Sequence, residues 1–384
     1  MRISSDPAAR RRLAILAGAA TAALIAGVAI GAGAGAGDDA AEIRDEREPG
    51  QRSGQVDTPA EAVDRLSLRQ QVGQLTISSF EAGPLPDYVR RRLRAGETAG
   101  VILFGFNAAT LGDWRRLTRA VQRPARGGAL VMVDQEGGDV QAVAFAGPPV
   151  GQPLQGDPAA VRHGARAAAR RLRAAGVNVN LAPVADVPGG PAPVMGSRAF
   201  AGTASGIAAR TSASIEGMGA AGVGATAKHF PGLGRAQVNT DDGSTVVSGD
   251  LDADLVPFRA AIEARVPLVM LSHALYPAVD PRRIASQSPA IVDGLLRDEL
   301  GFDGVIATDS IEAQAVLDRS GVARAAERSI RAGADLILMT GSASWNAVHP
   351  WLMRRARASE AFRERIRLSA ARVLALKERL GLLD

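Results

Sequence analysis

Short apolar runs rich in β-branched residues recur along this chain and are separated by segments with helical periodicity. The helical segments include Pro158–Ala175, Asp250–Ala264 and Gly321–Ala332. Strands that alternate with helices predict a parallel sheet with helical crossovers. Eight such runs fit a (β/α)8 barrel of the TIM type, with a doubly wound open sheet as the alternative. The expected strands are Val72–Ser79, Gly100–Phe106, Ala129–Asp134, Val177–Val184, Gly222–Ala227, Val266–Ser272, Gly304–Asp309 and Asp335–Thr340.

The N-terminal part, residues 1–37, differs from the rest of the chain. The basic run Arg10–Arg12 precedes an uncharged stretch of 25 residues, Leu13–Gly37. This pattern predicts either a cleaved export signal or a membrane anchor. Residues 38–59 are polar and aperiodic and predict a linker, so the barrel domain is expected over residues 60–384. The protein is therefore expected to be secreted or to lie in the cell envelope, with the N-terminal segment as signal or membrane tether.

Composition excludes several classes of site. The chain has no cysteine, which removes disulfides, thiolate zinc sites and cysteine nucleophiles. Its four histidines include no pair with the spacing of a helical metal site, so neither a metal nor a cofactor is expected. The net charge of +5 comes from arginines that lie among acidic and alanine residues in expected helices, such as Asp87–Arg94 and Arg162–Arg173. These are interpreted as solvated helix faces, and no nucleic-acid partner is expected.

Polar side chains follow several of the expected strands, at the point where each strand ends. The carboxyl ends of barrel strands open onto one face, where active sites of this fold lie, so these side chains are expected to converge. Two or more carboxylates at a concave rim without metal ligands suit acid/base and nucleophilic chemistry on a glycosidic bond. The residues are Asp134 after the third run, Lys228 and His229 after the fifth, Ser272 and His273 at the end of the sixth, and Asp309 at the end of the seventh.

Sequence blocks around these residues carry a resemblance to a known family. The set resembles glycoside hydrolase family 3, specifically its single-barrel β-N-acetylglucosaminidases, from about residue 64 to the C-terminus. The resemblance implies a metal-free, retaining hydrolase with a carbohydrate substrate. The blocks are, in order, Val133–Gly138, Asn180–Val184, Gly196–Arg198, Lys228–Gly232, Gly301–Ile306, Thr308–Asp309 and Ala332–Asp335.

The resemblance also implies roles for individual residues. Asp309 is the nucleophile, since a retaining enzyme needs an ionised carboxylate beneath the anomeric carbon. Asp134, Arg198, Lys228 and His229 match positions that bind the hydroxyls of the terminal sugar. Lysine suits this task because its ammonium is compact, whereas the planar fork of arginine is larger. The chain has only two lysines among its 45 basic residues, which favours a functional reason for lysine at position 228.

The chain departs from the family pattern at two places. An arginine usually follows the Gln-Glu-Gly-Gly stretch, with another three residues on, whereas this chain has Asp139 and Ala142 there. One sugar contact is therefore expected to be missing, which leaves the glycone open. The family's acid/base histidine and its aspartate partner are replaced by Asp241 and Asn239.

Two interpretations of Asp241 follow. It could serve as a carboxylic general acid if burial or the nearby Asp309 raises its pKa, with Asp242 as the neighbouring candidate. Alternatively, the loop has no proton donor and the barrel is an envelope sugar-binding pseudoenzyme. The expected function is a monomeric, exported exo-β-N-acetylglucosaminidase that acts on cell-wall-derived β-GlcNAc glycans or muropeptide fragments. A family 3 hydrolase for another β-glycone, such as glucose, is the remaining alternative.

Overall fold

The computed structural model describes residues 59–189 and 194–383, which all belong to one compact unit, Val56–Asp384. The predicted export segment, residues 1–37, lies outside the described residues, as does nearly all of the predicted linker. Within the described ranges, none of the helices is both long enough and apolar enough to cross a membrane.

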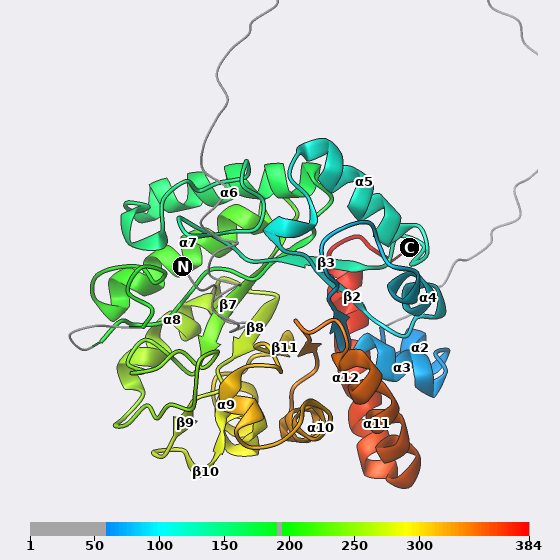
Figure 1. Ribbon diagram of the computed structural model, residues 1–384. Helices are drawn as coiled ribbons and strands as arrows, with labels where there is room; N and C mark the ends of the chain where they lie inside the picture. Colours follow the sequence, from blue (N-terminus) through cyan, green and yellow to red (C-terminus); the bar gives the residue numbers. More distant parts are fainter. Residues whose placement is uncertain (1–58, 190–193, 384) are drawn as a thin grey trace, which may run out of the picture. The chain divides into compact units, whose positions relative to one another are not determined.

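Eight parallel strands form a barrel in the order β11-β8-β7-β6-β3-β2-β1-β12 (Figure 1). The two ends of this order meet, because Ala307 and Leu336 are bridged in parallel and the Leu336 amide donates to the Ile306 carbonyl at 3.1 Å. The predicted barrel is therefore confirmed, and the open-sheet alternative is wrong. The strands are β1 (Thr76–Ser78), β2 (Gly100–Ile102), β3 (Leu130–Val133), β6 (Val179–Asn180), β7 (Gly224–Phe230), β8 (Leu268–Leu271), β11 (Val305–Thr308) and β12 (Ile337–Leu338).

Helices surround the strands (Figure 1). Local sequence sets where they begin: Thr110 caps α5, since its hydroxyl accepts from the Asp113 amide while the Asp113 carboxylate accepts from the Thr110 amide. Such a capping box satisfies N–H groups that the helix cannot pair internally. The helices are α2 (Pro59–Asp64), α3 (Leu68–Gln74), α4 (Asp87–Ala95), α5 (Leu111–Gln122), α6 (Pro158–Ala174), α7 (Ala204–Gly219), α8 (Asp252–Glu263), the π-helical η4 (Ala290–Glu299), α9 (Gln314–Leu317), α10 (Val322–Ala332), α11 (Ser344–Ala358) and α12 (Glu360–Arg379).

The barrel strands bury both of their faces, as strands of parallel sheets do. Along β3, Leu130 and Met132 belong to the cluster inside the barrel, while Val131 between them packs into the cluster beneath the helices. Val373 and Leu376 of α12 join the interior cluster. The last helix therefore fills the end of the barrel where the strands begin, and leaves the opposite mouth for function.

The first expected strand begins too early. Val72–Gln74 form the last residues of α3, not the start of a strand. Ser67 and Gln70 cap this helix reciprocally, so the helical conformation continues through the apolar residues that follow. The β-branched Val72 is buried, but its contacts are those of a helix face, which a short apolar run alone does not distinguish from a strand.

The fifth strand ends later than predicted. Lys228 and His229 were expected after the strand, but β7 continues through both to Phe230. Both backbone groups of Lys228 are paired with the segment after β6, since its amide donates to the Pro183 carbonyl at 3.2 Å and its carbonyl accepts from the Ala185 amide at 2.6 Å. This pairing holds both functional side chains on the sheet itself rather than on a loop.

Candidate active site

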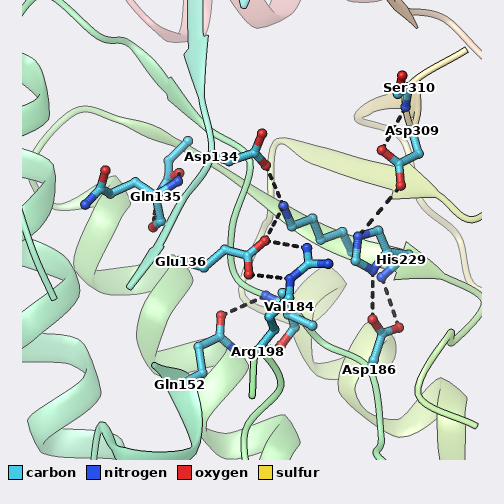
Figure 2. A network of polar contacts seen from close by, with 12 residues as sticks. Asp134, Gln135, Glu136, Gln152, Val184, Asp186, Arg198, His229, Asp309 and Ser310 are labelled. Carbon is cyan, nitrogen blue, oxygen red and sulfur yellow. Dashed lines mark hydrogen bonds and ion pairs between the residues drawn. The ribbon is translucent and has the colours of Figure 1, made fainter. Parts of the chain in front are cut away.

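The carboxyl ends of the strands meet at one mouth of the barrel, and the predicted site residues converge there (Figure 2). Asp134 directly follows β3, Asp309 directly follows β11, and Lys228 and His229 lie in the last part of β7. Arg198 reaches the same place from the segment between β6 and α7. Residues from four separate parts of the chain thus form one polar cluster on a rigid scaffold.

Lys228 is the centre of an ion-pair network. Only 2% of its side chain is exposed, and its Nζ lies 2.6 Å from Asp134 Oδ1 and 2.7 Å from Glu136 Oε1. Arg198 binds the same Glu136 carboxylate through two nitrogens, with Nε at 2.8 Å and Nη2 at 2.7 Å. The side chains of Asp134 and Arg198 are 29% and 22% exposed, so these two members of the network are open to solvent, whereas Lys228 and Glu136 are buried.

The network holds its members in their charged forms. Burial alone would raise the pKa of Glu136, but the charges of Lys228 and Arg198 and their hydrogen bonds lower it to about 2. Burial would likewise lower the pKa of Lys228, but Asp134 and Glu136 outweigh it and raise the value. Opposite charges within hydrogen-bond distance favour the ionised form of each partner. The mouth therefore presents fixed charges and donors before any ligand arrives.

His229 is oriented by a fully buried carboxylate. Its Nδ1 lies 2.8 Å from Asp186 Oδ2, and because a carboxylate accepts, Nδ1 carries the hydrogen. The other oxygen of Asp186 accepts from the backbone amides of His229 at 3.1 Å and Leu233 at 2.7 Å. These bonds turn Nε2 of His229 toward Asp309, whose Oδ2 is 3.8 Å away (Figure 2).

Asp309 is held by the residues that follow it. Its Oδ1 accepts from the Ser310 amide at 2.7 Å, which leaves Oδ2 on the side of His229. His273 accepts from or donates to Ser286 through Nδ1 at 2.7 Å, and its Nε2 lies 3.0 Å from the Ser310 carbonyl. Since a carbonyl only accepts, Nε2 of His273 carries a hydrogen and fixes this backbone.

The electrostatic surroundings keep Asp309 ionised. Burial would raise the pKa of Asp309, but His229, His273 and Lys228, with the hydrogen bond from Ser310, lower it below its usual value. Burial lowers the pKa of His273. A single hydrogen on that ring is consistent with donation to the Ser310 carbonyl and acceptance from the Ser286 hydroxyl.

Asp241 lies on the segment between β7 and α8, in a turn that Asn239 stabilises. The side chain of Asn239 accepts from the Asp241 amide at 3.2 Å, and its carbonyl accepts from the Asp242 amide at 2.9 Å. Although Asp241 as a whole residue is exposed, burial around its carboxyl group and then the negative charge of Asp309 raise its pKa to about 6. The charge of His229 acts on the same carboxyl group and lowers its pKa, so the carboxyl group lies within electrostatic range of the site.

Comparison with known proteins identifies the family. Residues 67–376 match the family described as glycosyl hydrolase family 3 N terminal domain. The chain belongs to this family. A β-hexosaminidase of Stenotrophomonas maltophilia (strain R551-3) is 36% identical over 261 residues, which cover 64% of this chain and 77% of that protein. The predictions of family, fold and glycoside hydrolase class are confirmed.

Two solved family 3 structures are similar in fold. A β-N-acetylglucosaminidase from Paenibacillus sp. str. FPU-7 superposes with a TM-score of 0.78 at 36% identity, covering 83% of this chain and 63% of that one. This chain therefore spans less than two thirds of the Paenibacillus chain. A β-N-acetylhexosaminidase from Beutenbergia cavernae DSM 12333 has a TM-score of 0.72 at 36% identity, covering 82% of this chain and 99% of that one.

Two site residues of this family 3 barrel were missed from the sequence. The side chains of Glu136 and Asp186 are buried, and they hold Lys228, Arg198 and His229 in place. A signal existed for Glu136, which lies two residues after Asp134 in a strand-end block and so points to the same side. Asp186 lies just beyond the Asn180–Val184 block, and nothing in its spacing predicts contact with a residue 43 positions away.

The remaining predicted positions are also accounted for. Asp139 is exposed in the turn between β4 (Gln135–Gly137) and β5 (Val140–Gln141), and Ala142 directly follows β5. Ser272 is buried, and its hydroxyl accepts from the Ala274 amide at 3.0 Å, which is a turn contact. Among the described residues, no group of three or more His, Asp or Glu side chains is arranged to hold a metal ion.

Proposed function

We propose that this protein is a retaining exo-β-N-acetylglucosaminidase in which Asp309 is the nucleophile and Asp241 is the acid/base. One observation carries the proposal: two carboxyl groups face the same mouth, and their surroundings shift their pKa values in opposite directions, lower for Asp309 and to about 6 for Asp241. Such a pair assigns an ionised carboxylate to nucleophilic attack and a protonated one to proton donation.

In the first step, an oxygen of Asp309 attacks the anomeric carbon and the bond to the leaving group breaks. Asp241 donates its proton to the departing oxygen. In the second step, Asp241 removes a proton from water, which attacks the same carbon and releases Asp309. Asp241 is negatively charged when it acts as this base and repels phosphate. Water is therefore the expected acceptor of the glycosyl group.

The sugar is held by the charged network opposite Asp309. Asp134 and Arg198 are the partly exposed members of this network, and Lys228 and His229 line the wall between them and Asp309. Carboxylates, ammonium and guanidinium groups at fixed positions match the hydroxyls of a terminal sugar through charge-assisted hydrogen bonds. Glu136 and Asp186 act beneath them and keep them in place.

The choice of β-linked GlcNAc rests on the similarity to a β-hexosaminidase and to a β-N-acetylglucosaminidase. The choice of cell-wall-derived glycans outside the cytoplasm rests on residues 1–37, whose basic start and apolar stretch are typical of export.

The test is hydrolysis of chromogenic β-GlcNAc and β-glucose substrates by the parent protein and by Asp309→Asn. We expect faster hydrolysis of the β-GlcNAc substrate and a loss of roughly 10⁴-fold or more in Asp309→Asn, since an amide cannot form the ester. A fluorinated glycosyl donor should label Asp309, as read by peptide mass mapping. Preference for glucose would indicate another glycone, and sugar binding without any hydrolysis would indicate a pseudoenzyme.

A second experiment tests the acid/base assignment. Asp241→Ala should slow hydrolysis of substrates with poor leaving groups by about 10²–10⁴-fold and that of activated aryl glycosides far less. Azide, which needs no base, should restore the second step and yield a β-glycosyl azide. If Asp241→Ala treats both substrate types as the parent does, the assignment is wrong, and Asp242 is the next candidate.

A further inference from the structure

The segment that carries Asp241, residues 231–251, is fastened at its base. Arg235 binds Asp254 of α8 with Nε at 3.0 Å and Nη2 at 2.6 Å, and donates to the carbonyls of Ser248 and Asp250. These bonds tie the start of the segment to its end. Arg235 thereby closes the segment into a loop, which we call the Asp241 loop.

The middle of the Asp241 loop is paired with the segment that follows β8. The Leu275 amide donates to the Thr245 carbonyl at 3.0 Å, and the Val247 amide donates to the Leu275 carbonyl at 2.9 Å. This short ladder fixes one side of the loop. The turn with Asn239, Thr240 and Asp241 precedes this ladder in the chain.

That turn is held by α9. The amide of Gln314 donates to the carbonyl of Asp241 at 3.3 Å, and the amide of Ala315 donates to the carbonyl of Thr240 at 3.1 Å. These are the first two residues of α9, whose N–H groups have no partner inside the helix. The helix and the turn therefore satisfy each other's backbone groups.

A side-chain contact supports the same junction. Asp318, which follows α9, accepts from the Ser244 hydroxyl at 3.0 Å and from the Gln314 side-chain amide at 2.6 Å. These groups are exposed, so each bond contributes modestly, on the order of 1 kcal/mol or less. With the two backbone bonds, the bond from Ser244 joins the loop to the α9 region at three points, and the bond from Gln314 holds the Asp318 side chain in place.

The residues before α9 begin at Asp309. The Asp309 amide donates to the Leu271 carbonyl at 3.2 Å, and the Ile311 amide donates to the Leu338 carbonyl at 3.0 Å, so strands on both sides hold this stretch. Five residues after Asp309, Gln314 binds Asp241. One anchored segment thus carries Asp309 and, through the backbone amide of Gln314, also binds the main chain of Asp241.

We propose that Gln314 is a positioning residue whose backbone amide holds Asp241 at its working distance from Asp309. This inference rests on the proposed role of Asp241 as the acid/base. An aspartate carries its carboxyl group one carbon from the main chain, so the position of this carboxyl follows the backbone closely. A proton donor must lie within hydrogen-bond reach of the leaving oxygen, and a displacement of about 1 Å costs on the order of a hundredfold in rate.

Gln314 offers a matched pair of variants. Gln314→Ala removes the side-chain bond to Asp318 and keeps the backbone amide. Gln314→Pro also removes the amide hydrogen and puts a ring carbon in its place against the Asp241 carbonyl. Proline suits the first position of a helix, and the preceding Ala313 is extended with ψ 140°, as a residue before proline prefers.

The experiment measures kcat/KM on β-GlcNAc substrates with a poor and an activated leaving group, for the parent, both Gln314 variants and Asp241→Ala. We expect Gln314→Pro to lose roughly tenfold to a hundredfold on the poor leaving group and less than about threefold on the activated one. Gln314→Ala should lose less than about threefold on either. The limb of the pH profile that Asp241 governs should shift in Gln314→Pro, which a general loss of stability would not produce.

The outcomes separate the two proposals. If Asp241→Ala depends on the leaving group but Gln314→Pro resembles Gln314→Ala, the positioning role is overturned and the acid/base remains. If Gln314→Pro slows both substrates equally, the junction serves the fold alone, and the inference is again overturned. If Asp241→Ala is insensitive to the leaving group, the acid/base assignment itself fails. Should Gln314→Pro not fold, an ester bond in place of the Gln314 backbone amide removes the same hydrogen without adding a ring, and the same loss confined to the poor leaving group is expected.

Discussion

Lys228 and Lys377 are the two lysines of the chain, and both are buried, but at opposite ends of the barrel. Lys228 lies where β7 ends, between the carboxylates of Asp134 and Glu136. Lys377 lies near the end of α12, where its Nζ donates to the side-chain oxygen of Gln74 at 2.7 Å, two residues before β1 begins. One lysine is at the mouth and the other at the end that α12 fills.

The same burial has opposite consequences at these two places. Burial disfavours the charged form of both ammonium groups, but the carboxylates beside Lys228 reverse this effect and raise its pKa. Beside Lys377, an amide oxygen replaces them, and burial lowers its pKa to about 7. A buried lysine in this protein is therefore held in its charged form where carboxylates lie beside it. The comparison teaches that partners, not burial, decide its charge.

The largest expected contrast comes from replacing each lysine by methionine. Lys228→Met leaves Glu136 and Asp134 with one cation fewer, and we expect kcat/KM to fall about a thousandfold. Loss of one partner from a buried pair also costs about 3–5 kcal/mol of unfolding free energy. Lys377→Met should retain the parent's kcat/KM within about twofold, because no site residue contacts position 377.

Steady-state kinetics and denaturant unfolding of both variants measure this contrast. If Lys377→Met loses activity as severely as Lys228→Met, the two ends of the barrel are coupled and the comparison fails.

The next contrast keeps the charge and changes the shape. Lys228→Arg should lower kcat/KM by about a hundredfold, because the planar guanidinium needs more room than the ammonium and displaces the sugar. The ion pairs with Asp134 and Glu136 are retained, so unfolding free energy should change less than in Lys228→Met. The kinetics of Lys228→Arg with a β-GlcNAc substrate test this. An unchanged kcat/KM would mean that Lys228 holds the network without contacting the sugar.

The difference between the lysines also marks how far sequence reasoning reaches. The barrel and the convergence of Asp134, Lys228 and Asp309 could be predicted, since strand periodicity and strand ends are local features. The role of Lys228 in binding the sugar could be predicted only through the family resemblance. Its partner Glu136 was overlooked, because no local pattern shows which carboxylate a buried cation selects.

Other features required the three-dimensional structure. The contact of Asp186 with His229 and the grip of α9 on Asp241 join positions far apart in the chain. The raised pKa of Asp241 depends on burial and on the charge of Asp309, which sequence spacing does not determine. Sequence named Asp241 as a candidate, and the surroundings supply the physical reason for a proton on it.

A smaller effect is the pH dependence of stability. The folded pKa of Lys377 is about 7, below the ordinary value of 10.5, so the unfolded chain binds more protons between these values. The unfolding free energy should therefore rise as pH increases from about 7 to about 9.5, by on the order of 2–3 kcal/mol from this group. Lys377→Met should remove that rise. Denaturant unfolding at a series of pH values measures it, and equal slopes in parent and variant would contradict the lowered pKa.

The smallest effect concerns the hydrogen bond between Lys377 and Gln74. Gln74→Leu leaves the buried amine without this acceptor and should cost about 1 kcal/mol of unfolding free energy in the parent. In Lys377→Met, the same change removes an acceptor that has lost its donor, so Gln74→Leu should there be neutral or stabilising. A double-mutant cycle at pH 8 then gives a coupling energy of about 1 kcal/mol or more. A coupling near zero would mean that the amine needs no partner at this end of the barrel, and that burial alone sets its state.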